Sequence, residues 1–230
     1  MRVHPSPPSP PFNALAARRL REALGMAPGH VAYGLRAQYG LPVSPETVVA
    51  WERGQAAPDA RELTALAGVL WCSPGELLAA ASTLREHRIA RALAPEDLAR
   101  RIGLDVKAYL RMEESGRWRG NERQTAALAD VLSLGPRELL TATGRDHDLA
   151  EVLRSAATTR WQAYVRPVAK LVPLDRHRLE DTLQQLHAEY QSRMVATGSW
   201  GADVTGDSGG EAGRVYLDRI IDHFWDLARV

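Results

Sequence analysis

The sequence predicts an all-α protein in which two consecutive helical domains precede a helical C-terminal region. Helix-start residues such as Ser, Asp and Asn recur along the chain, and apolar residues follow them at helical spacing. Part of the first domain is repeated later, and a long amphipathic stripe lies near the C-terminus. With 230 residues, 45% of them apolar and 25% charged, the chain can bury a substantial core.

The clearest single helix is predicted to begin after Ser44. The hydroxyl of Ser44 can accept a hydrogen bond from a free N–H of the first turn, and Pro45 suits the first helical position. Val48 and Trp51 lie three residues apart and therefore share one face. Gly54 can adopt the left-handed conformation that ends a helix.

Another helix, Pro28–Tyr39, is predicted just before this one, across the turn Gly40-Leu41-Pro42. Two short helices joined by a tight turn that contains Gly form the helix-turn-helix pattern. We expect them to belong to one five-helix domain over residues 13–81. The remaining helices of that domain are expected over residues 13–25, from Pro58-Asp59, and from Ser73, where Glu76 completes a capping box.

The segment Trp51-Glu52-Arg53-Gly54, at the end of the predicted third helix, carries a family resemblance. With the helix-turn-helix around it, this stretch resembles the DNA-binding domains of the phage-repressor (lambda-repressor-like) class, the XRE-type transcriptional regulators. The strong preference for Arg over Lys is similar to that of actinobacterial regulators of this class. The resemblance implies a five-helix domain that binds double-stranded DNA.

The same pattern occurs a second time in the chain. Residues 127–132 repeat the pattern of residues 65–70, and residues 136–140 repeat that of residues 74–78, both at an offset of 62 residues. We therefore expect a second, tandem helix-turn-helix domain over residues 82–144. Its second helix is predicted over Pro95–Ile102, its turn at Gly103, and its third helix over Asp105–Ser115.

The resemblance also implies one structural ion pair in each domain. Members of the family usually carry an Arg late in helix one that pairs with the Glu of the helix-three motif. Arg21 and Glu52 occupy these positions in the first domain. Arg88 and Glu113 occupy them in the second, where Ala92 replaces the usual helix-ending glycine. Each pair is expected to hold the first helix against the third.

Residues 145–197 differ in character from the two repeats and are expected to form a helical region. One helix is predicted from Asp146 to about Val165, where Pro167 would break or kink it. A long helix begins at Pro173 and carries an amphipathic stripe. The stripe consists of Leu179, Leu183, Leu186, Tyr190 and Met194.

Residues 198–213 contain six glycines together with Ser, Thr and Asp, and this composition predicts a flexible linker. Residues 214–230 are then predicted to form an amphipathic last helix, which must dock on its own chain or on a partner. This helix and the stripe Leu179–Met194 together present more apolar surface than a monomer usually exposes. We therefore expect a homodimer held through residues 146–230.

By the family resemblance, the N-terminal part of each third helix enters the major groove and reads base edges. In the first domain Glu46 can accept a hydrogen bond from a cytosine amino group, whereas Pro45 and Ala50 offer only apolar contacts. Phosphate contacts are assigned to His30, Arg36, Gln38 and Arg53, while Pro28 stands where relatives often carry a DNA-contacting glutamine. The candidate DNA-binding residues of this domain are Ser44, Pro45, Glu46, Thr47, Ala50 and Arg53.

The second domain is more basic at the matching positions. Lys107 and Arg111 suit the O6 and N7 atoms of guanine. Arg117, Arg119 and Arg123 follow closely, next to Trp118, and would contact phosphates, although a solvated surface loop is an equally good interpretation. The candidate DNA-binding residues of this domain are Asp105, Val106, Lys107, Arg111, Arg117, Arg119 and Arg123.

Composition limits the other function classes. A net charge of +1 gives no general attraction to nucleic acid, so any DNA-binding face must come from local clustering. The single cysteine, Cys72, cannot form an internal disulfide, and no apolar run or signal-peptide pattern indicates a membrane. We therefore expect a cytoplasmic, nucleoid-associated protein. Its Pro-rich residues 1–12 would form an extended or disordered tail.

The predicted function is a sequence-specific transcriptional regulator that binds double-stranded DNA. No glycine-rich phosphate loop and no HExxH pattern is present, so neither catalysis nor a metal or cofactor is expected. One alternative is a protein-interaction module that has kept the fold but no longer reads DNA, which Pro45 and Ala50 favour. The other is a ligand-responsive regulator with a small-molecule site among its C-terminal helices.

Overall fold

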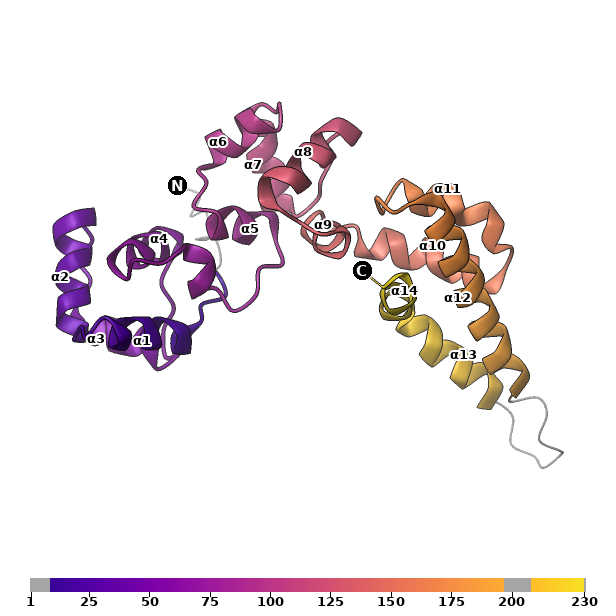
Figure 1. The fold of residues 1–230 in the computed structure, drawn as a ribbon, viewed down its shortest axis with the longest axis horizontal. Coiled ribbons are helices and arrows are strands. Elements are labelled where there is room, and N and C mark those ends of the chain that lie inside the picture. Colours follow the sequence, from indigo (N-terminus) through magenta and orange to yellow (C-terminus); the bar gives the residue numbers. More distant parts are fainter. Residues whose placement is uncertain (1–8, 197–207, 230) are drawn as a thin grey trace, which may run out of the picture. The chain divides into compact units, whose positions relative to one another are not determined.

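The computed structural model describes residues 9–196 and 208–229, and every named element within these ranges is a helix. The all-α prediction is therefore confirmed for this part of the chain. The chain divides into two compact units, Met1–Leu132 and Ser133–Val230, which are treated one at a time (Figure 1). No helix within the described ranges is long and apolar enough to span a bilayer.

Short polar side chains cap several helices of the first unit. The Asn13 side chain accepts a hydrogen bond from the Ala16 N–H at 3.0 Å, and the Ser44 hydroxyl accepts one from the Thr47 N–H at 3.2 Å. Asp59 caps a later helix in the same way. The elements are α1 Ala14–Ala23, α2 Pro28–Tyr39, α3 Pro45–Glu52, α4 Ala60–Val69, the 3-10 turn η1 Pro74–Leu77, α5 Leu84–Ala90, α6 Pro95–Arg101, α7 Val106–Ser115 and α8 Glu122–Leu132.

The fifth helix expected in the first domain is only the short 3-10 turn η1. Glu76 caps this turn as predicted, because its carboxylate accepts hydrogen bonds from the Ser73 N–H at 2.8 Å and from the Ser73 hydroxyl at 2.9 Å. The chain then leaves the helix because its backbone pairs with residues ahead of α1. The Asn13 N–H donates to the Leu77 carbonyl at 2.8 Å, and the Ala79 N–H donates to the Pro11 carbonyl at 2.8 Å.

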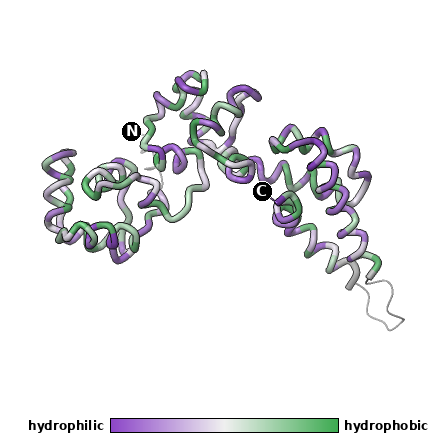
Figure 2. The backbone as a smooth tube through the Cα atoms, viewed as in Figure 1, coloured by the Kyte–Doolittle hydropathy of each residue, from purple (hydrophilic) through white to green (hydrophobic). Residues whose placement is uncertain are grey.

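Trp51 lies at the centre of the first core, where only 2% of its surface is exposed. Val31 and Leu35 of α2 and Leu63 and Leu66 of α4 belong to the same core. Complete burial of a large apolar side chain contributes about 1.5–3 kcal/mol, so these few residues provide much of the stability of this half. Figure 2 shows apolar and polar residues interspersed along each helix, as expected when one face of a helix is buried and the other is exposed.

The second half of this unit is built around its own buried residues. Leu98 of α6, Tyr109 of α7 and Leu128 of α8 are all fully buried. Ile89 of α5 instead belongs to the core formed by α2, α3 and α4, so α5 packs with the preceding helices as well. The two repeats therefore share one continuous unit in the first part of the chain.

The second unit is a helical bundle with a single apolar core. The side chains of Leu179, Leu183 and Leu186 are completely buried, as are those of Ile220 and Phe224 from the C-terminal end of the chain. The last helix of the chain therefore docks on its own chain. The elements are α9 Pro136–Ala142, α10 Asp146–Thr158, the 3-10 turn η2 Trp161–Tyr164, α11 Val165–Ala169, α12 Arg176–Ala196, α13 Ser208–Asp218 and α14 Ile220–Ala228.

The helix expected to run from Asp146 to about Val165 ends earlier, at Thr158, well before Pro167. The Thr158 hydroxyl donates to the Arg154 carbonyl at 2.8 Å, and the Thr159 hydroxyl donates to the Ser155 carbonyl at 2.6 Å. Such bonds compete with the helical backbone and favour its termination. Pro167 instead lies inside the short helix α11.

The C-terminal segment also differs from its prediction. Residues 208–213, expected in the linker, form the first turns of α13, and the rest of the expected linker lies outside the described residues, as does most of the tail at residues 1–8. The single last helix is divided into α13 and α14 at Arg219. α9, which the internal repeat assigns to the second domain, lies in the second unit, and Leu140 of α9 belongs to that unit's core.

Candidate nucleic-acid interface

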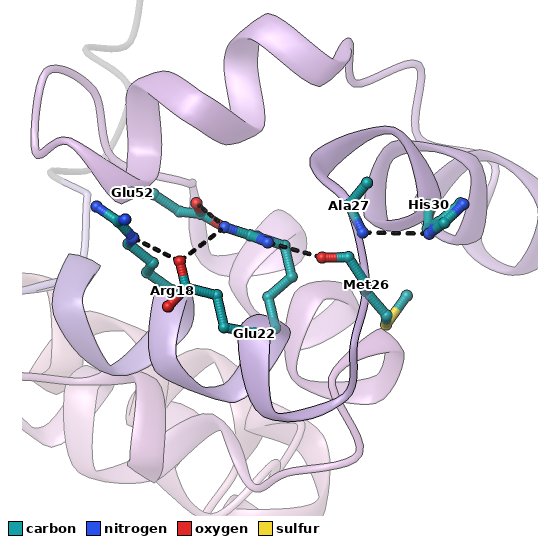
Figure 3. A network of polar contacts seen from close by, with 7 residues as sticks. Arg18, Glu22, Met26, Ala27, His30 and Glu52 are labelled. Atoms are coloured by element: carbon teal, nitrogen blue, oxygen red, sulfur yellow. Dashed lines mark hydrogen bonds and ion pairs between the residues drawn. The ribbon is translucent and has the colours of Figure 1, made fainter.

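An ion pair joins α1 to α3 in the first repeat (Figure 3). The Arg21 side chain donates two hydrogen bonds to the Glu52 carboxylate, at 2.5 Å and 2.8 Å, and a third to the Met26 carbonyl at 2.7 Å. The two side chains are 10% and 9% exposed, so water hardly screens the pair. The hydrogen bond to Glu52 raises the pKa of Arg21, with burial acting in the opposite direction. The predicted pair is present.

The second repeat has the same arrangement with one addition. Arg88 donates to both carboxylate oxygens of Glu113, at 2.8 Å and 2.7 Å, and also to the Leu93 carbonyl at 2.9 Å. The Tyr109 hydroxyl donates to Glu113 as well, at 2.5 Å. Val48 stands at the position of Tyr109 in the first repeat, so no hydroxyl joins that pair, and Glu22 instead lies 3.6 Å from the Arg21 guanidinium.

The electrostatics of this network keep its arginine charged and its tyrosine neutral. Burial lowers the pKa of Arg88, but the hydrogen bond and charge of Glu113 raise it by more. Burial raises the pKa of Tyr109, and the negative charge of Glu113 adds to that effect. Tyr109 is therefore a constant hydrogen-bond donor, and α7 is held from its inner face.

Ala92 ends α5 in a left-handed conformation, with a φ of 52°. This is the position that glycine would usually occupy, and the same conformation is adopted by Gly25 at the end of α1, with a φ of 64°. A Cβ atom makes this conformation unfavourable, so Ala92 stores local strain that Gly25 avoids. The Arg88 bond to the Leu93 carbonyl, immediately beyond Ala92, holds the turn in place.

The exposed side of α3 carries little charge. Ser44, Pro45 and Glu46 are exposed, while Thr47 and Ala50 are half-buried. A hydrogen bond with the Ser44 side chain and one with the backbone lower the pKa of Glu46, so its carboxylate is ionised at neutral pH.

Beside α3 lies an open hollow of about 460 Å³ that the sequence did not predict. Its lining is mostly apolar, and two charged side chains stand within it. Arg53 and Gln55, just after α3, are part of this lining. The lining residues are Pro28, Gly29, Pro45, Glu46, Val49, Ala50, Arg53 and Gln55.

Other residues assigned to phosphates in the first repeat are exposed on α2. Arg36 and Gln38 face solvent. His30 is exposed as well, but its ring nitrogen Nδ1 accepts a hydrogen bond from the Ala27 N–H at 3.1 Å (Figure 3). His30 therefore has a capping role at the start of α2, one residue beyond Gly29 in the lining of the hollow.

The outer surface of α7 is more basic than that of α3. Asp105 caps the helix by accepting a hydrogen bond from the Ala108 N–H at 3.0 Å, and Val106 is half-buried. Lys107 and Arg111 lie four residues apart on the exposed side. Neither makes an ion pair or a side-chain hydrogen bond with any residue that the structure describes. Both side chains are available to a ligand.

The loop after α7 is held in place by Trp118, which is only 8% exposed. Its indole N–H donates to the Thr125 hydroxyl at 2.8 Å, and the backbone N–H of Arg119 donates to the Met112 sulfur at 3.1 Å. A methyl group added at Gly120 would lie 2.3 Å from the Trp118 ring, so this position requires glycine. Trp118 is thus a core residue and not an exposed neighbour of the arginines.

Asn121 and Gln124, which the sequence interpretation missed, fix the start of α8. Each side chain accepts a hydrogen bond from the other residue's backbone N–H, both at 2.9 Å, and the Gln124 amide also donates to the Gly103 carbonyl at 3.1 Å. The spacing of Asn121 and Gln124 is that of a capping box, which was the available signal. These bonds connect the loop to the turn before α7.

Three arginines project from this anchored loop and the first turn of α8. Arg117, Arg119 and Arg123 are all exposed. None of their side chains bonds to another part of the described chain.

A scan of protein-family models and searches of curated proteins and of solved structures return no match to this chain. The geometry and charge of these residues are therefore the basis for assigning a function.

Proposed function

We propose that the protein is a sequence-specific transcriptional regulator that binds double-stranded DNA through two tandem helix-turn-helix domains of the phage-repressor class. The two domains would be residues 13–81 and 82–144, with α3 and α7 as their recognition helices. The helical region that follows would serve assembly or partner binding. The N-terminal part of each recognition helix would enter the major groove, as in this class of domain.

One observation carries the proposal: α7 is fixed on its inner face and exposes unpaired cations on its outer face. Its inner face is held by Tyr109 and by the pair of Glu113 with Arg88, and its outer face presents Lys107 and Arg111 without carboxylate partners. A rigid helix with unpaired cations loses little conformational freedom on binding. A guanidinium can bond to O6 and N7 of guanine together, which gives a preference for one base pair.

The arginines of the anchored loop suit a second task. Arg117, Arg119 and Arg123 are exposed beside the recognition helix, and their loop is fixed by Trp118. Cations at such positions can neutralise phosphates, which contributes affinity without sequence preference. The second repeat would thus supply both base contacts and phosphate contacts.

The first test compares three single substitutions in the full chain. We expect Arg111→Ala to weaken binding to a selected genomic site by about 1–3 kcal/mol and to relax the preference at one base pair. Glu46→Ala should have a smaller effect, because the first repeat offers one carboxylate and apolar groups. Arg119→Ala should weaken cognate and scrambled DNA alike and reduce the salt dependence by about one phosphate contact.

The measurement is a fluorescence titration of each variant with cognate and scrambled duplexes at two salt concentrations. Arg19→Ala is the matched control, because Arg19 is exposed on α1 and makes no side-chain bond within the described chain. If Arg111→Ala binds like the unchanged protein while Glu46→Ala loses discrimination, the first repeat is the reader. If the unchanged protein binds no duplex at any salt concentration, the proposed function is wrong.

A second candidate function is favoured by the hollow beside α3. Its apolar lining at Pro28, Pro45, Val49 and Ala50 suits an apolar side chain of another protein better than phosphates. In that case the first repeat would be a protein-interaction module. Ala50→Arg would separate the two functions, because an added cation should strengthen DNA binding at a reading position and block an apolar protein contact.

The homodimer stays a prediction, but most of the apolar surface that suggested it is buried within the chain itself. The stripe on α12 and the apolar face of α14 are buried against each other, so they do not require a second chain. Exposed apolar side chains remain at Met194, Val195 and Val215. We expect light scattering of the full chain to give the mass of a dimer, and Val215→Glu to shift it toward a monomer. A monomeric mass for the unchanged protein would contradict this prediction.

A further inference from the structure

The second unit contains a run of cations without a single carboxylate. Between Glu151 and Asp175 the chain carries Arg154, Arg160, Arg166 and Lys170 and no Asp or Glu. Arg154 is half-buried and donates to the Leu217 carbonyl at 3.3 Å. The other three are exposed, and their side chains make no ion pair or hydrogen bond with the described residues.

Two of these cations lie on the same face of α11, and Arg145 from the start of α10 joins them. Arg166 and Lys170 are four residues apart, so their side chains project to the same side. Arg145, at the start of α10, donates to the Lys170 carbonyl at 3.3 Å. Arg145, Arg166 and Lys170 with Arg160 are called the α11 surface below.

The carboxylates nearest in the chain are occupied elsewhere. Glu151 lies 3.3 Å from the His147 Nε2 atom, and Asp146 accepts a hydrogen bond from the Thr141 hydroxyl at 3.1 Å. Asp175 caps α12 by accepting from the His177 N–H at 2.9 Å and the Arg178 N–H at 3.3 Å. Glu180 pairs with Arg176 at 2.8 Å. The α11 surface therefore lacks the counter-charges that adjacent parts of this unit have.

Local stability does not account for this arrangement. Like charges four residues apart repel each other and destabilise a helix. The C-terminal end of a helix favours cations, but α11 has only five residues, so this effect is small. Arg145 already donates a hydrogen bond to the carbonyl of Lys170, the residue that ends α11. A surface of unpaired cations without an internal role is typical of a site that binds an anion.

We propose that the α11 surface is a second DNA-contacting site, which binds backbone phosphates of double-stranded DNA. This inference rests on the proposed function. Guanidinium groups bind phosphate oxygens in pairs, and the α11 surface has three of them. The contact adds affinity without base preference, because phosphates carry no sequence information.

The same segment argues against a lipid surface as the anionic partner. A helix that binds a bilayer places exposed aromatic or aliphatic side chains among the lipids, next to its cations. Trp161 and Tyr164, the two aromatic residues of this segment, pack against the core of the second unit. No large apolar residue from 152 to 174 is exposed. The α11 surface therefore has charged groups for an anionic partner but no exposed apolar groups for a bilayer.

The test is a triple variant of the full chain, Arg160→Ala with Arg166→Ala and Lys170→Ala, titrated with cognate and scrambled duplex across a range of salt. Each phosphate contact contributes about 0.9 to the slope of log affinity against log salt. We expect the slope to flatten by about two to three units and the affinity for both duplexes to fall by the same factor. Equal melting temperatures would show that the fold is intact.

A matched control removes three exposed arginines that do have carboxylate partners in the same unit. Arg137 and Arg219 lie 3.3 Å and 3.9 Å from Asp222, and Arg176 pairs with Glu180. Their triple alanine variant loses the same charge and should keep the slope of the unchanged protein. Vesicles that contain phosphatidylserine should not bind the unchanged protein.

The outcomes separate this inference from the proposed function. If the unchanged protein binds duplex and the α11 variant keeps its full slope, the second site does not exist while the proposed function stands. A control variant that flattens the slope equally would also overturn the inference, since net charge alone would then explain it. Vesicle binding that depends on the α11 surface would replace DNA by a membrane. If the unchanged protein binds no duplex, both proposals fail.

Discussion

Replacing Glu113 by Ala should lower the free energy of unfolding of the second repeat by about 3–5 kcal/mol, as removing one partner of a buried ion pair does. Glu113 accepts two hydrogen bonds from Arg88 and one from Tyr109. Without it, a guanidinium that is only 10% exposed loses its carboxylate and a buried hydroxyl loses its acceptor. Native proteins are stable by only about 5–15 kcal/mol, so this loss would remove a large fraction of the stability.

The measurement is urea unfolding followed by circular dichroism, with Glu114→Ala as the matched control. Glu114 is the next residue on α7, is exposed, and makes no bond within the described chain, so its removal should change stability by less than about 0.5 kcal/mol. A double variant, Arg88→Leu with Glu113→Leu, should recover part of the loss, because no buried charge is then left unpaired. If Glu113→Ala melts within a degree or two of the unchanged protein, the pair does not stabilise the fold.

Arg21→Ala should have a similar but smaller effect on the first repeat. Glu52 then loses both of its hydrogen bonds from Arg21, but Val48 replaces the tyrosine, so no additional hydroxyl is involved. Arg19→Ala is again the control on the same helix. Equal stability of the Arg21→Ala and Arg19→Ala variants would contradict the structural role of the pair.

Phe224→Ala should destabilise the second unit by about 3–5 kcal/mol, the usual cost of removing a fully buried phenyl ring. Phe224 is completely buried in α14, and its ring centroid lies 5.0 Å from that of Trp225 in an edge-on contact. The ring belongs to the same core as Leu183 and Leu186 of α12. Its removal should loosen α14 and expose the apolar stripe of α12, which binding of a hydrophobic dye would detect.

Asp226→Ala is the control, because Asp226 is exposed on the same helix and makes no bond within the described ranges. Chemical unfolding should be recorded with separate probes, since a chain with two compact units need not unfold in a single step. An unchanged transition for Phe224→Ala would mean that α14 does not contribute to this core. A transition that moves with protein concentration would show that association of two chains contributes to the stability of this unit.

The sequence by itself determined the features that depend on neighbouring residues. Helix α2 begins at Pro28 and ends at Tyr39 as predicted, and α3 begins after the Ser44 cap, because caps, prolines and helix-ending glycines act within one or two turns. The stripe Leu179, Leu183 and Leu186 was visible for the same reason, since helical spacing alone places these residues on one face. The Arg21–Glu52 and Arg88–Glu113 pairs were expected only from the family resemblance.

The tertiary structure decided the features that depend on residues far apart in the chain. The fifth element of the first repeat is the short turn η1, because residues 11 to 13 offer it backbone partners. Trp118 is an exception, because its contacts are close in the chain: Thr125 accepts its indole N–H and Gly120 leaves room for its ring, which no helical spacing pattern indicates. α13 and α14 dock on α12, where an amphipathic face alone left a partner chain equally possible. Periodicity shows that a face must be buried, but only the folded chain determines which surface covers it.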